Sequence, residues 1–195
     1  MMQVHVRLLQ GNWNLGYALD KHTVRSIYLG DNEYGRAQFD TQRSEAGEAL
    51  FRLKYRSDLN QVQPLAQALS EHICPLIPEP GAIIPMPAST ERPFQPVTVV
   101  ARTLGQIMKT PVVENVLHKA QGGPKLKDVA CRADKVQALE GKFFTVDNLP
   151  YNGARPVLLL DDLFDSGATA EAATTALLRY PKVSSVLLVT LTSKV

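Results

Sequence analysis

Two adjacent carboxylates and a short polar loop follow an apolar run late in the chain. Asp161 and Asp162 come after four aliphatic residues, and the segment 163–169 reads L-F-D-S-G-A-T. A helical pattern over 170–180 follows directly. The free amides and the positive end of a helix N-terminus favour an anion, and paired acids suit sugar hydroxyls or a metal-bound diol. These residues predict a pocket for a ribose that carries a phosphate.

The loop of residues 165–169 would bind the phosphate. Its backbone amides and the hydroxyls of Ser166 and Thr169 are donors, and Gly167 lets the backbone approach a phosphate closely or take a positive φ. In an extended strand Asp161 and Asp162 would point to opposite faces. We expect the chain to turn at the two acids, so that both reach one ligand; capping of the next helix is the alternative.

Strand and helix patterns alternate from residue 81 onward, and they position these residues. The alternation predicts an α/β fold with a mostly parallel sheet and helices on both faces. Ligands of such sheets bind beyond the carboxyl ends of the strands, where the loops 85–96 and 161–169 lie. The expected strands are 81–85, 111–117, 143–146, 157–160 and 186–192, and the expected helices are 97–108, 128–140 and 170–180.

The first 43 residues read as a β-rich unit. Alternating patterns predict a hairpin of strands 4–8 and 13–17, and a third strand at 22–29. Two helices follow, one over 44–55 with Ser44 as its cap and one from about 62 to 73. We therefore divide the chain into an N-terminal β appendage or hood, 1–43, and a core domain, 44–195.

The composition excludes several classes of function. A 45% hydrophobic and 21% charged chain of 195 residues is typical of a globular protein, and its net charge of +2 makes direct DNA binding unlikely. No apolar run approaches the ~20 residues of a membrane span. Two cysteines without a C-x-x-C motif and four scattered histidines give no zinc module. We expect a cytoplasmic protein with reduced thiols.

Residues 157–169 resemble the phosphoribosyl-pyrophosphate (PRPP) motif of type I phosphoribosyltransferases. The resemblance implies that Asp161 and Asp162 hold the ribose hydroxyls and that 165–169, including Ala168, cradle the 5′-phosphate. It implies a pyrophosphate loop at 84–89, and Mg²⁺ bridging pyrophosphate and ribose oxygens without a protein cage. The candidate contacts in and after this loop are Pro87, Ala88, Ser89 and Arg92.

Four segments extend the resemblance to ComF-type, competence-related phosphoribosyltransferase-like proteins. They are L-K-Y-R-S-D (53–58), I-I-P-M-P (83–87), E-R-P-F-Q (91–95) and 132–143. The chain lacks the N-terminal zinc finger common in those proteins, and Pro93 replaces the glycine of their R-G-F-N-Q. Because Pro93 removes a backbone donor, the family's pyrophosphate contacts do not carry over directly.

Asp165 is a further departure from the ComF-type pattern, in which Thr is usual. Hypoxanthine-guanine and xanthine enzymes have Asp there, where it resembles a general base, so Asp165 is our candidate catalytic residue; a helix cap is the alternative. Only one strand is expected after Thr169, which leaves base recognition to the N-terminal unit. Trp13, Tyr17 or Tyr28 would stack on the base, with plain packing as the alternative.

The basic segment 119–127 is expected to be a mobile lid over the reaction centre, with a solvated loop as the alternative. Its candidate cations, with one from the next segment, are Lys119, Lys125, Lys127 and Arg132. Lys54 and Arg56 read equally well as surface charges.

Three functions stay open at this point. The first is a phosphoribosyltransferase acting on a nitrogen of a base or amine. The second is a non-catalytic PRPP or nucleotide sensor, and the third is a ComF-like accessory protein in DNA uptake or processing. The hairpin and the terminal strand favour a homodimer.

Overall fold

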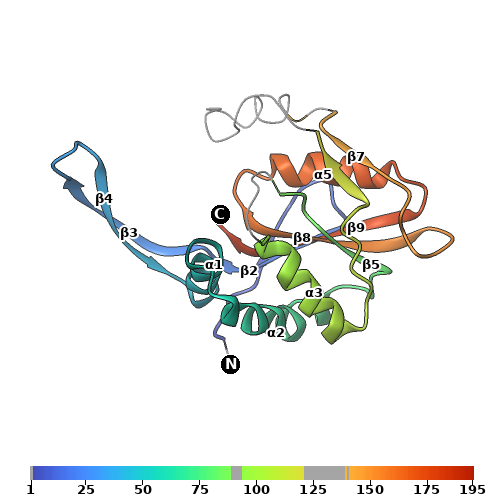
Figure 1. The fold of residues 1–195 in the computed structure, drawn as a ribbon, viewed down its shortest axis with the longest axis horizontal. Helices are drawn as coiled ribbons and strands as arrows, with labels where there is room; N and C mark the ends of the chain where they lie inside the picture. Colours follow the sequence, from blue (N-terminus) through green and yellow to red (C-terminus); the bar gives the residue numbers. More distant parts are fainter. Residues whose placement is uncertain (1, 89–93, 121–138, 140) are drawn as a thin grey trace.

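A five-stranded sheet forms the centre of the molecule (Figure 1). The computed structural model describes residues 2–88, 94–120, 139 and 141–195. The strand order is β1-β2-β9-β8-β5; β2, β9, β8 and β5 run parallel, and β1 pairs antiparallel with β2. The strands are β1 (Arg7–Leu8), β2 (Leu15–Lys21), β9 (Val183–Ser193), β8 (Arg155–Phe164) and β5 (Ala82–Pro85).

Helices cover both faces of this sheet. Among the described residues, three helices pack on one face, and another packs on the other face together with a small antiparallel ribbon. They are α1 (Glu45–Arg56), α2 (Val62–His72), α3 (Pro96–Met108) and, opposite, α5 (Ala168–Leu178) with β6 (Leu117–Lys119) and β7 (Phe143–Thr145). Short 3-10 turns at Leu59–Gln61 and Cys74–Leu76 flank α2. The predicted α/β class, a mostly parallel sheet flanked by helices, is confirmed.

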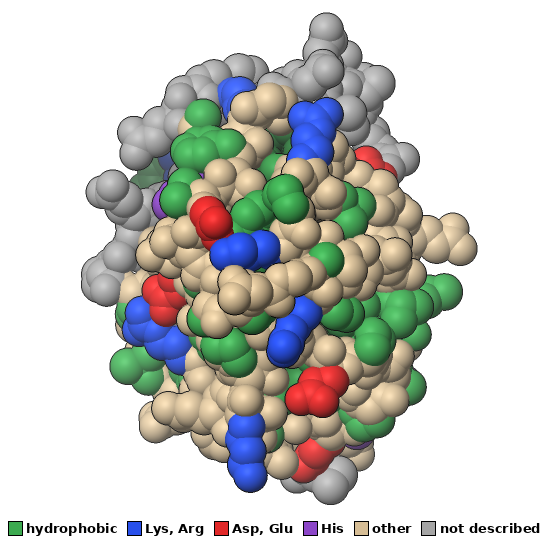
Figure 2. Space-filling view, turned by 90° about the vertical axis from the view of Figure 1, so that its right-hand side faces the viewer, with side chains coloured by type: hydrophobic (Ala, Val, Ile, Leu, Met, Phe, Trp, Pro, Cys, Tyr) green, Lys and Arg blue, Asp and Glu red, His purple; other side chains and the backbone are tan. Residues whose placement is uncertain are grey.

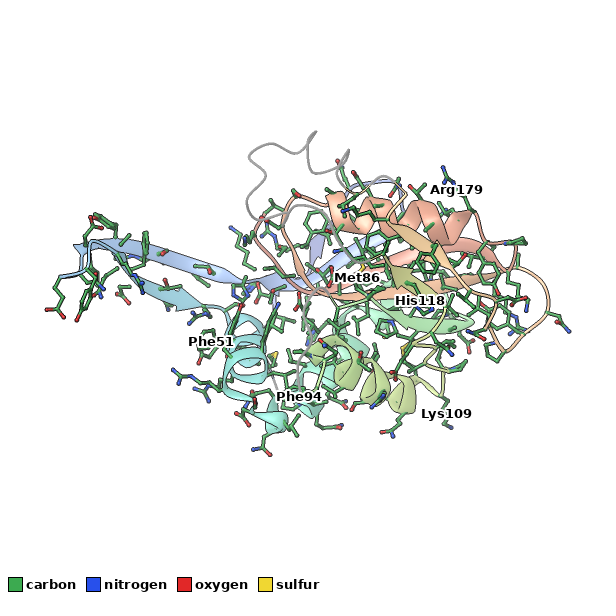
Figure 3. The ribbon with its side chains drawn as sticks, turned by 45° about the horizontal axis from the view of Figure 1, so that its top comes forward. Phe51, Met86, Phe94, Lys109, His118 and Arg179 are labelled. Atoms are coloured by element: carbon green, nitrogen blue, oxygen red, sulfur yellow. The ribbon has the colours of Figure 1, made fainter. Side chains whose placement is uncertain are left out.

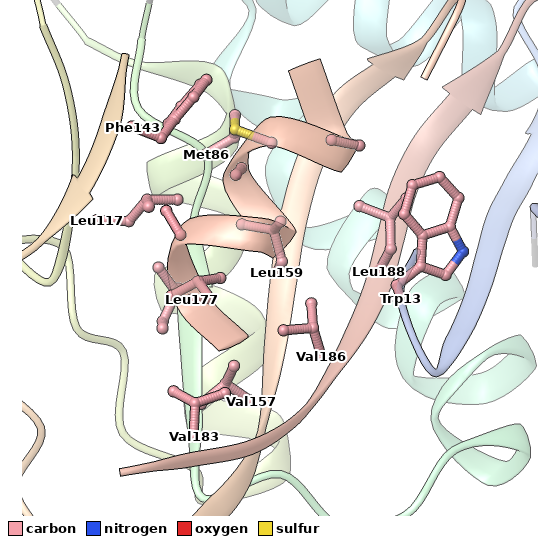
Figure 4. Close-up of a cluster of buried hydrophobic side chains, with 14 of the residues drawn as sticks. Trp13, Met86, Leu117, Phe143, Val157, Leu159, Leu177, Val183, Val186 and Leu188 are labelled. Atoms are coloured by element: carbon pink, nitrogen blue, oxygen red, sulfur yellow. The ribbon is translucent and has the colours of Figure 1, made fainter. Parts of the chain in front are cut away.

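The alternation of β8 divides the core into two layers. Val157 and Leu159 pack toward α5, whereas Leu158 and Leu160 pack toward α1, α2 and α3, and all four side chains are fully buried. Figure 4 shows the α5-side layer, which includes Leu159, Leu177 and Val186, with Leu188 beside Trp13. A strand buried on both faces reads as a continuous apolar run, which is why V-L-L-L was recognisable in the sequence.

Two predicted strand boundaries are wrong. The expected strand at 111–117 is reduced to a parallel bridge between Ile83 and Val112, because a turn at 114–116 follows at once. The strand expected to end at 160 continues through both acids to Phe164, because β9 pairs with it along that whole length. The expected helix at 128–140 lies almost entirely outside the described residues.

The N-terminal residues divide between the sheet and a projecting arm. The predicted hairpin is present as β1 and β2, but β2 pairs in parallel with β9 and so belongs to the central sheet. β3 (Thr23–Asp31) and β4 (Ala37–Arg43) form a separate ribbon, which projects from the body and does not cover it as a hood would (Figure 1). The division of the chain at residue 43 stays a prediction.

Helix α1 is fixed to the end of β2 by its cap. The Ser44 hydroxyl accepts from the Gly47 amide at 3.0 Å and donates to the Lys21 carbonyl, which confirms Ser44 as the N-cap. A Cβ added at Gly47 would lie 2.1 Å from the carbonyl oxygen of His22. The start of α1 is thus held against the backbone that leads into the arm.

None of the described helices is long and apolar enough to cross a membrane.

Replacing Gly47 with alanine should destabilise the fold. Within a helix this change normally stabilises by up to about 1 kcal/mol, but here the methyl group meets fixed backbone. We expect the free energy of unfolding to fall by about 1–3 kcal/mol, measured by urea denaturation. Gln67→Ala on the exposed face of α2 is the control; a stabilised Gly47→Ala variant would contradict the packing described.

Candidate functional site

The carboxyl ends of β5 and β8 lie at a topological switch point, and the region beyond them is called the crevice below. After β5 the chain passes through α3 to the bridge at Val112, on the edge of β5 away from β8. After β8 it passes through α5 to β9, on the opposite side. The two connections leave in opposite directions, and such a crevice at the carboxyl ends of the strands is where open α/β sheets bind ligands.

Three predicted segments meet at this crevice. Pro85 pairs with Leu160, and the Met86 amide donates to the Leu160 carbonyl at 2.7 Å. Pro87 and Ala88 therefore follow β5 where Asp161 and Asp162 follow on β8, and the loop 165–169 leads from β8 into α5. Figure 3 shows Met86 in this region, at the end of β5. Ser89 and Arg92 lie outside the described residues, as do Lys125, Lys127 and Arg132.

The two acids do not share one side of the sheet. Because β8 continues past them, the alternation directs Asp162 toward α1 and Asp161 toward α5. The Lys54 ammonium of α1 forms an ion pair with Asp162, and both side chains are about one-fifth exposed (22% and 20%). The reading of Lys54 as a surface charge is therefore wrong. The expected turn at the acids is also wrong, and β8 leaves the two carboxylates on opposite faces.

Asp161 has a strongly perturbed carboxyl group. Burial is the main cause, with repulsion from the Asp162 carboxylate second, and together they raise the pKa of Asp161 to about 7. The Asp162 amide, which donates to Asp161 Oδ1 at 2.8 Å, and the ammonium groups of Lys54 and Lys119 act in the opposite direction. Burial likewise lowers the pKa of Lys119. A lysine thus approaches each acid from a different layer of the fold.

The phosphate-loop residues form the start of α5. Gly167 is its N-cap residue, with φ of +83° and no side-chain cap, which confirms the expected positive φ. The first helical bond runs from the Glu171 amide to the Gly167 carbonyl at 2.9 Å. The amides of Ala168, Thr169 and Ala170 precede that bond and have no helical acceptor. They form an anion-favouring terminus beside the switch point.

Asp165 is exposed at the mouth of this loop. Its carboxylate is 54% exposed and lies 3.4 Å from the ammonium of Lys194. The helix-cap alternative for Asp165 is wrong, since the cap residue is Gly167 and no side chain caps α5. Asp165 is therefore accessible to a ligand held in the loop.

Two of the three aromatic candidates for base stacking, Trp13 and Tyr17, pack within the fold, and the third, Tyr28, does not. Trp13 is buried, donates its indole N–H to the Leu9 carbonyl at 2.8 Å, and packs edge-on against Phe164 at 5.8 Å between ring centroids. Tyr17 is half-buried against the helical layer around α1 and α2. Tyr28 lies on the arm and donates to Asp31 at 2.8 Å.

Sequence reasoning missed His22, at the carboxyl end of β2. Its Nδ1 lies 3.1 Å from the hydroxyl of Thr192 on β9, whose hydroxyl donates to the Asp162 carbonyl at 3.3 Å. Burial lowers the pKa of His22, and the cations of Arg43, Lys54 and Lys194 lower it further. The sequence signal that could have identified His22 was the change from apolar to polar residues at the ends of β2 and β9.

The comparisons with known proteins give distant similarities to solved structures. No family model and no curated protein matches the chain. It is similar to a glutamine PRPP amidotransferase from B. subtilis complexed with ADP and GMP, at 14% identity over 91% of this chain and 37% of that one, with a TM-score of 0.49. The chain thus spans little more than a third of that protein.

Adenine phosphoribosyltransferases are further neighbours. The enzyme from Leishmania donovani is 11% identical over 96% of this chain and 75% of its own length, with a TM-score of 0.48. That from Leishmania tarentolae is 10% identical over 96% and 95%, with a TM-score of 0.47. Similarities this distant assign neither a family nor an activity to the chain.

The raised pKa of Asp161 predicts a pH-dependent effect of Asp161→Asn. The fold favours the protonated form of the Asp161 carboxyl. Its contribution to the free energy of unfolding is therefore fully present below the ordinary pKa of an aspartate and is lost as the pH rises through about 7. The stability of Asp161→Asn relative to wild type should rise by about 2–3 kcal/mol from pH 5 to pH 8, measured by denaturation at both pH values.

Asp147→Asn is the control for this measurement. Hydrogen bonds from Lys182 and Tyr180 lower the pKa of Asp147. Asp147 titrates below pH 5, so the difference in free energy of unfolding between Asp147→Asn and wild type should stay constant from pH 5 to pH 8. An equally flat offset for Asp161→Asn would show that Asp161 titrates normally.

Proposed function

We propose that the chain binds PRPP at the switch point and transfers its phosphoribosyl group to a nitrogen of a base or amine. One observation supports the proposal above all: Asp161, Asp162 and the start of α5 lie at the carboxyl end of β8, and the segment of Pro87 and Ala88 follows the neighbouring parallel strand β5 at the same end of the sheet. Each has the chemistry that one part of PRPP requires. The sequence motif that resembles the PRPP site occupies this same crevice.

The phosphate and the ribose are assigned to β8 and α5. The 5′-phosphate would accept from the first-turn amides of α5 and from Ser166 and Thr169. The ribose hydroxyls would donate to Asp161 and Asp162. A carboxylate has two acceptor oxygens, so Asp162 can bind a hydroxyl while it keeps its ion pair with Lys54.

The pyrophosphate is assigned to the segment after β5. Pro87 and Ala88 lead into it, and Ser89 and Arg92 are its proposed further contacts. Lys54 and Lys119 are cations near the acids from the two faces of the sheet. They would offset part of the charge that pyrophosphate brings, an electrostatic contribution that is strong in a partly buried site.

Mg²⁺ is the proposed cofactor, bound with PRPP. Carboxylate oxygens suit this ion, which is usually held by one or two carboxylates, substrate oxygens and water. PRPP oxygens and water would hold the ion near Asp161 and Asp162 without direct ligation by the protein, and the described residues contain no group of three or more acids, histidines or cysteines that would enclose a metal. When bound, the ion would neutralise pyrophosphate charge.

The reaction would be a displacement at ribose C1′. The nitrogen nucleophile forms the new C–N bond as the C1′–O bond to pyrophosphate breaks, through a state with oxocarbenium character. Positioning by the acid pair and the phosphate loop would supply much of the rate. Asp165, exposed at the loop, would accept the proton that the nucleophile loses.

A PRPP or nucleotide sensor is the second candidate. The ion pair between Lys54 and Asp162 favours binding without transfer, as does the absence of a hood formed by the arm over the crevice among the described residues. The accessory role in DNA uptake has no such observation among the described residues. A cytoplasmic location stays a prediction.

Calorimetric titration with PRPP and Mg²⁺ tests the binding proposal. We expect saturable heat for wild type and at least a tenfold loss of affinity for Asp161→Asn/Asp162→Asn, because the hydroxyl acceptors lose their charge. Asp147→Asn, outside the crevice, should bind like wild type. An absence of heat, with the double variant behaving like wild type, would reject PRPP as the ligand.

Asp165→Asn separates transfer from binding. We expect unchanged PRPP affinity but pyrophosphate release slower by about 10²–10⁴-fold, measured across a panel of bases and amines. Lys194→Met removes the cation beside Asp165 but keeps the Asp165 carboxylate, the proposed general base. The rate of pyrophosphate release should therefore fall far less in this variant. Binding without pyrophosphate release from wild type on any acceptor would favour the sensor.

A further inference from the structure

The arm formed by β3 and β4 has no covering layer. In the part of the chain that the structure describes, these strands pair only with each other. Every residue from Val24 to Leu29 and from Gly35 to Asp40 is exposed. A two-stranded ribbon is marginally stable in water on its own, so an arm bare on both faces lacks the packing that normally maintains such a structure.

Large apolar side chains concentrate on this arm. Six of the fourteen exposed large apolar residues in the described chain lie on it; they are Val24, Ile27, Tyr28, Leu29, Tyr34 and Phe39. The rings of Tyr28 and Phe39 meet across the strands at 5.6 Å between centroids, yet remain 55% and 57% exposed. On the face of the body shown in Figure 2, apolar side chains are interspersed with charged ones. Exposed apolar side chains gathered on one ribbon in this way mark an interaction surface.

The charges of the arm favour a protein partner. Three arginines and three acids balance along residues 23–43; they are Arg25, Arg36, Arg43, Asp31, Glu33 and Asp40. A neutral surface gives no electrostatic attraction to nucleic acid or to an anionic membrane. Interspersed charges around apolar side chains match a protein interface.

A second copy of the chain offers a surface with the required charges. The tip of the arm, residues 31–34, reads D-N-E-Y, with two acids and no cation. The last turns of α1, residues 52–56, read R-L-K-Y-R. Lys54 is held inside by its ion pair with Asp162, so the cations that this surface presents are Arg52, which pairs with Glu48 one turn earlier, and Arg56. Arg52, Tyr55 and Arg56 are exposed there, and Tyr55 packs on Phe51 at 5.3 Å between centroids.

The position of α1 gives these two surfaces a geometry in which they meet. α1 begins directly after β4, and Arg43 at the arm's root lies over the Phe51 ring at 3.9 Å. Figure 3 shows Phe51 on α1 beside that root. Nine strand residues span about 30 Å. When two arms lie side by side and antiparallel, the tip of each reaches the root of the other. From that root α1 extends past Glu45 and Glu48 to its basic last turn, so the tip must extend beyond the root along α1 to meet Arg56.

We propose that two copies of this chain associate through their arms, antiparallel about a two-fold axis, with each acidic tip against the basic end of the other copy's α1. The apolar side chains of the two arms cover one another along the middle of this interface. It is isologous, because the same surfaces serve both copies. The inference does not depend on the proposed activity, and the arm lies outside the residues assigned to PRPP.

Sedimentation velocity over about 1–100 μM tests the association. We expect a dimer whose dissociation constant rises at least tenfold in Leu29→Asp. Leu8→Asp, at a residue of matched exposure (64% against 65%) on β1, should leave it unchanged. Thermal melts would verify that both variants remain folded. A monomeric wild type, or a dimer that Leu29→Asp leaves intact, overturns the proposal.

Charge reversal tests the antiparallel arrangement. Glu33→Arg and Arg56→Glu each place like charges at both tip contacts of a homodimer, so each variant should dissociate. In a mixture of the two, the heterodimer has one reversed pair and one native pair, both attractive, and association should return toward wild type. A mixture that associates no better than either variant alone overturns the tip-to-root contact.

Discussion

The parallel pairing of β8 with β9 along its full length determines most of the site's geometry. Because that pairing runs to Phe164 and Ser193, the backbone at the two acids stays extended. Their carboxylates therefore enter different layers, and the groups that reach them come from elements far apart in the chain. Lys54 comes from α1 on one side, and Lys119 from β6 on the other. The chain cannot turn until the loop 165–167, which sets the start of α5 beyond the acids.

The charge of the crevice follows from that arrangement. Two adjacent, partly desolvated carboxylates repel each other, and the fold responds by favouring the protonated form of the more buried one, Asp161. Asp162 instead has a nearby cation, Lys54. The acids are thus inequivalent before any ligand binds, and near neutral pH the charge of the pair is adjustable, a property that suits a site for ligands rich in phosphate.

Sequence patterns predicted the elements whose causes are local. The Ser44 cap, the buried run at 157–160 and the helix that begins near residue 97 each depend on a few neighbouring residues, and all are present. The errors share a non-local cause. The length of β8 depends on β9, Trp13 packs against Phe164, and Lys54 meets an acid 108 residues away. No local pattern encodes these partners, so the residue types of the site were predictable but their relative directions were not.

The cap of α1 has a mechanical consequence. The Ser44 hydroxyl joins the start of α1 to the end of β2, and Gly47 lies against the carbonyl of His22. Both strands of the arm are therefore attached to the body at the same place. The same helix carries Lys54 into the crevice ten residues further on. The arm, the start of α1 and Asp162 are therefore linked by one continuous series of contacts. The projecting arm and the partly buried acids of the crevice are thus connected through a single short helix.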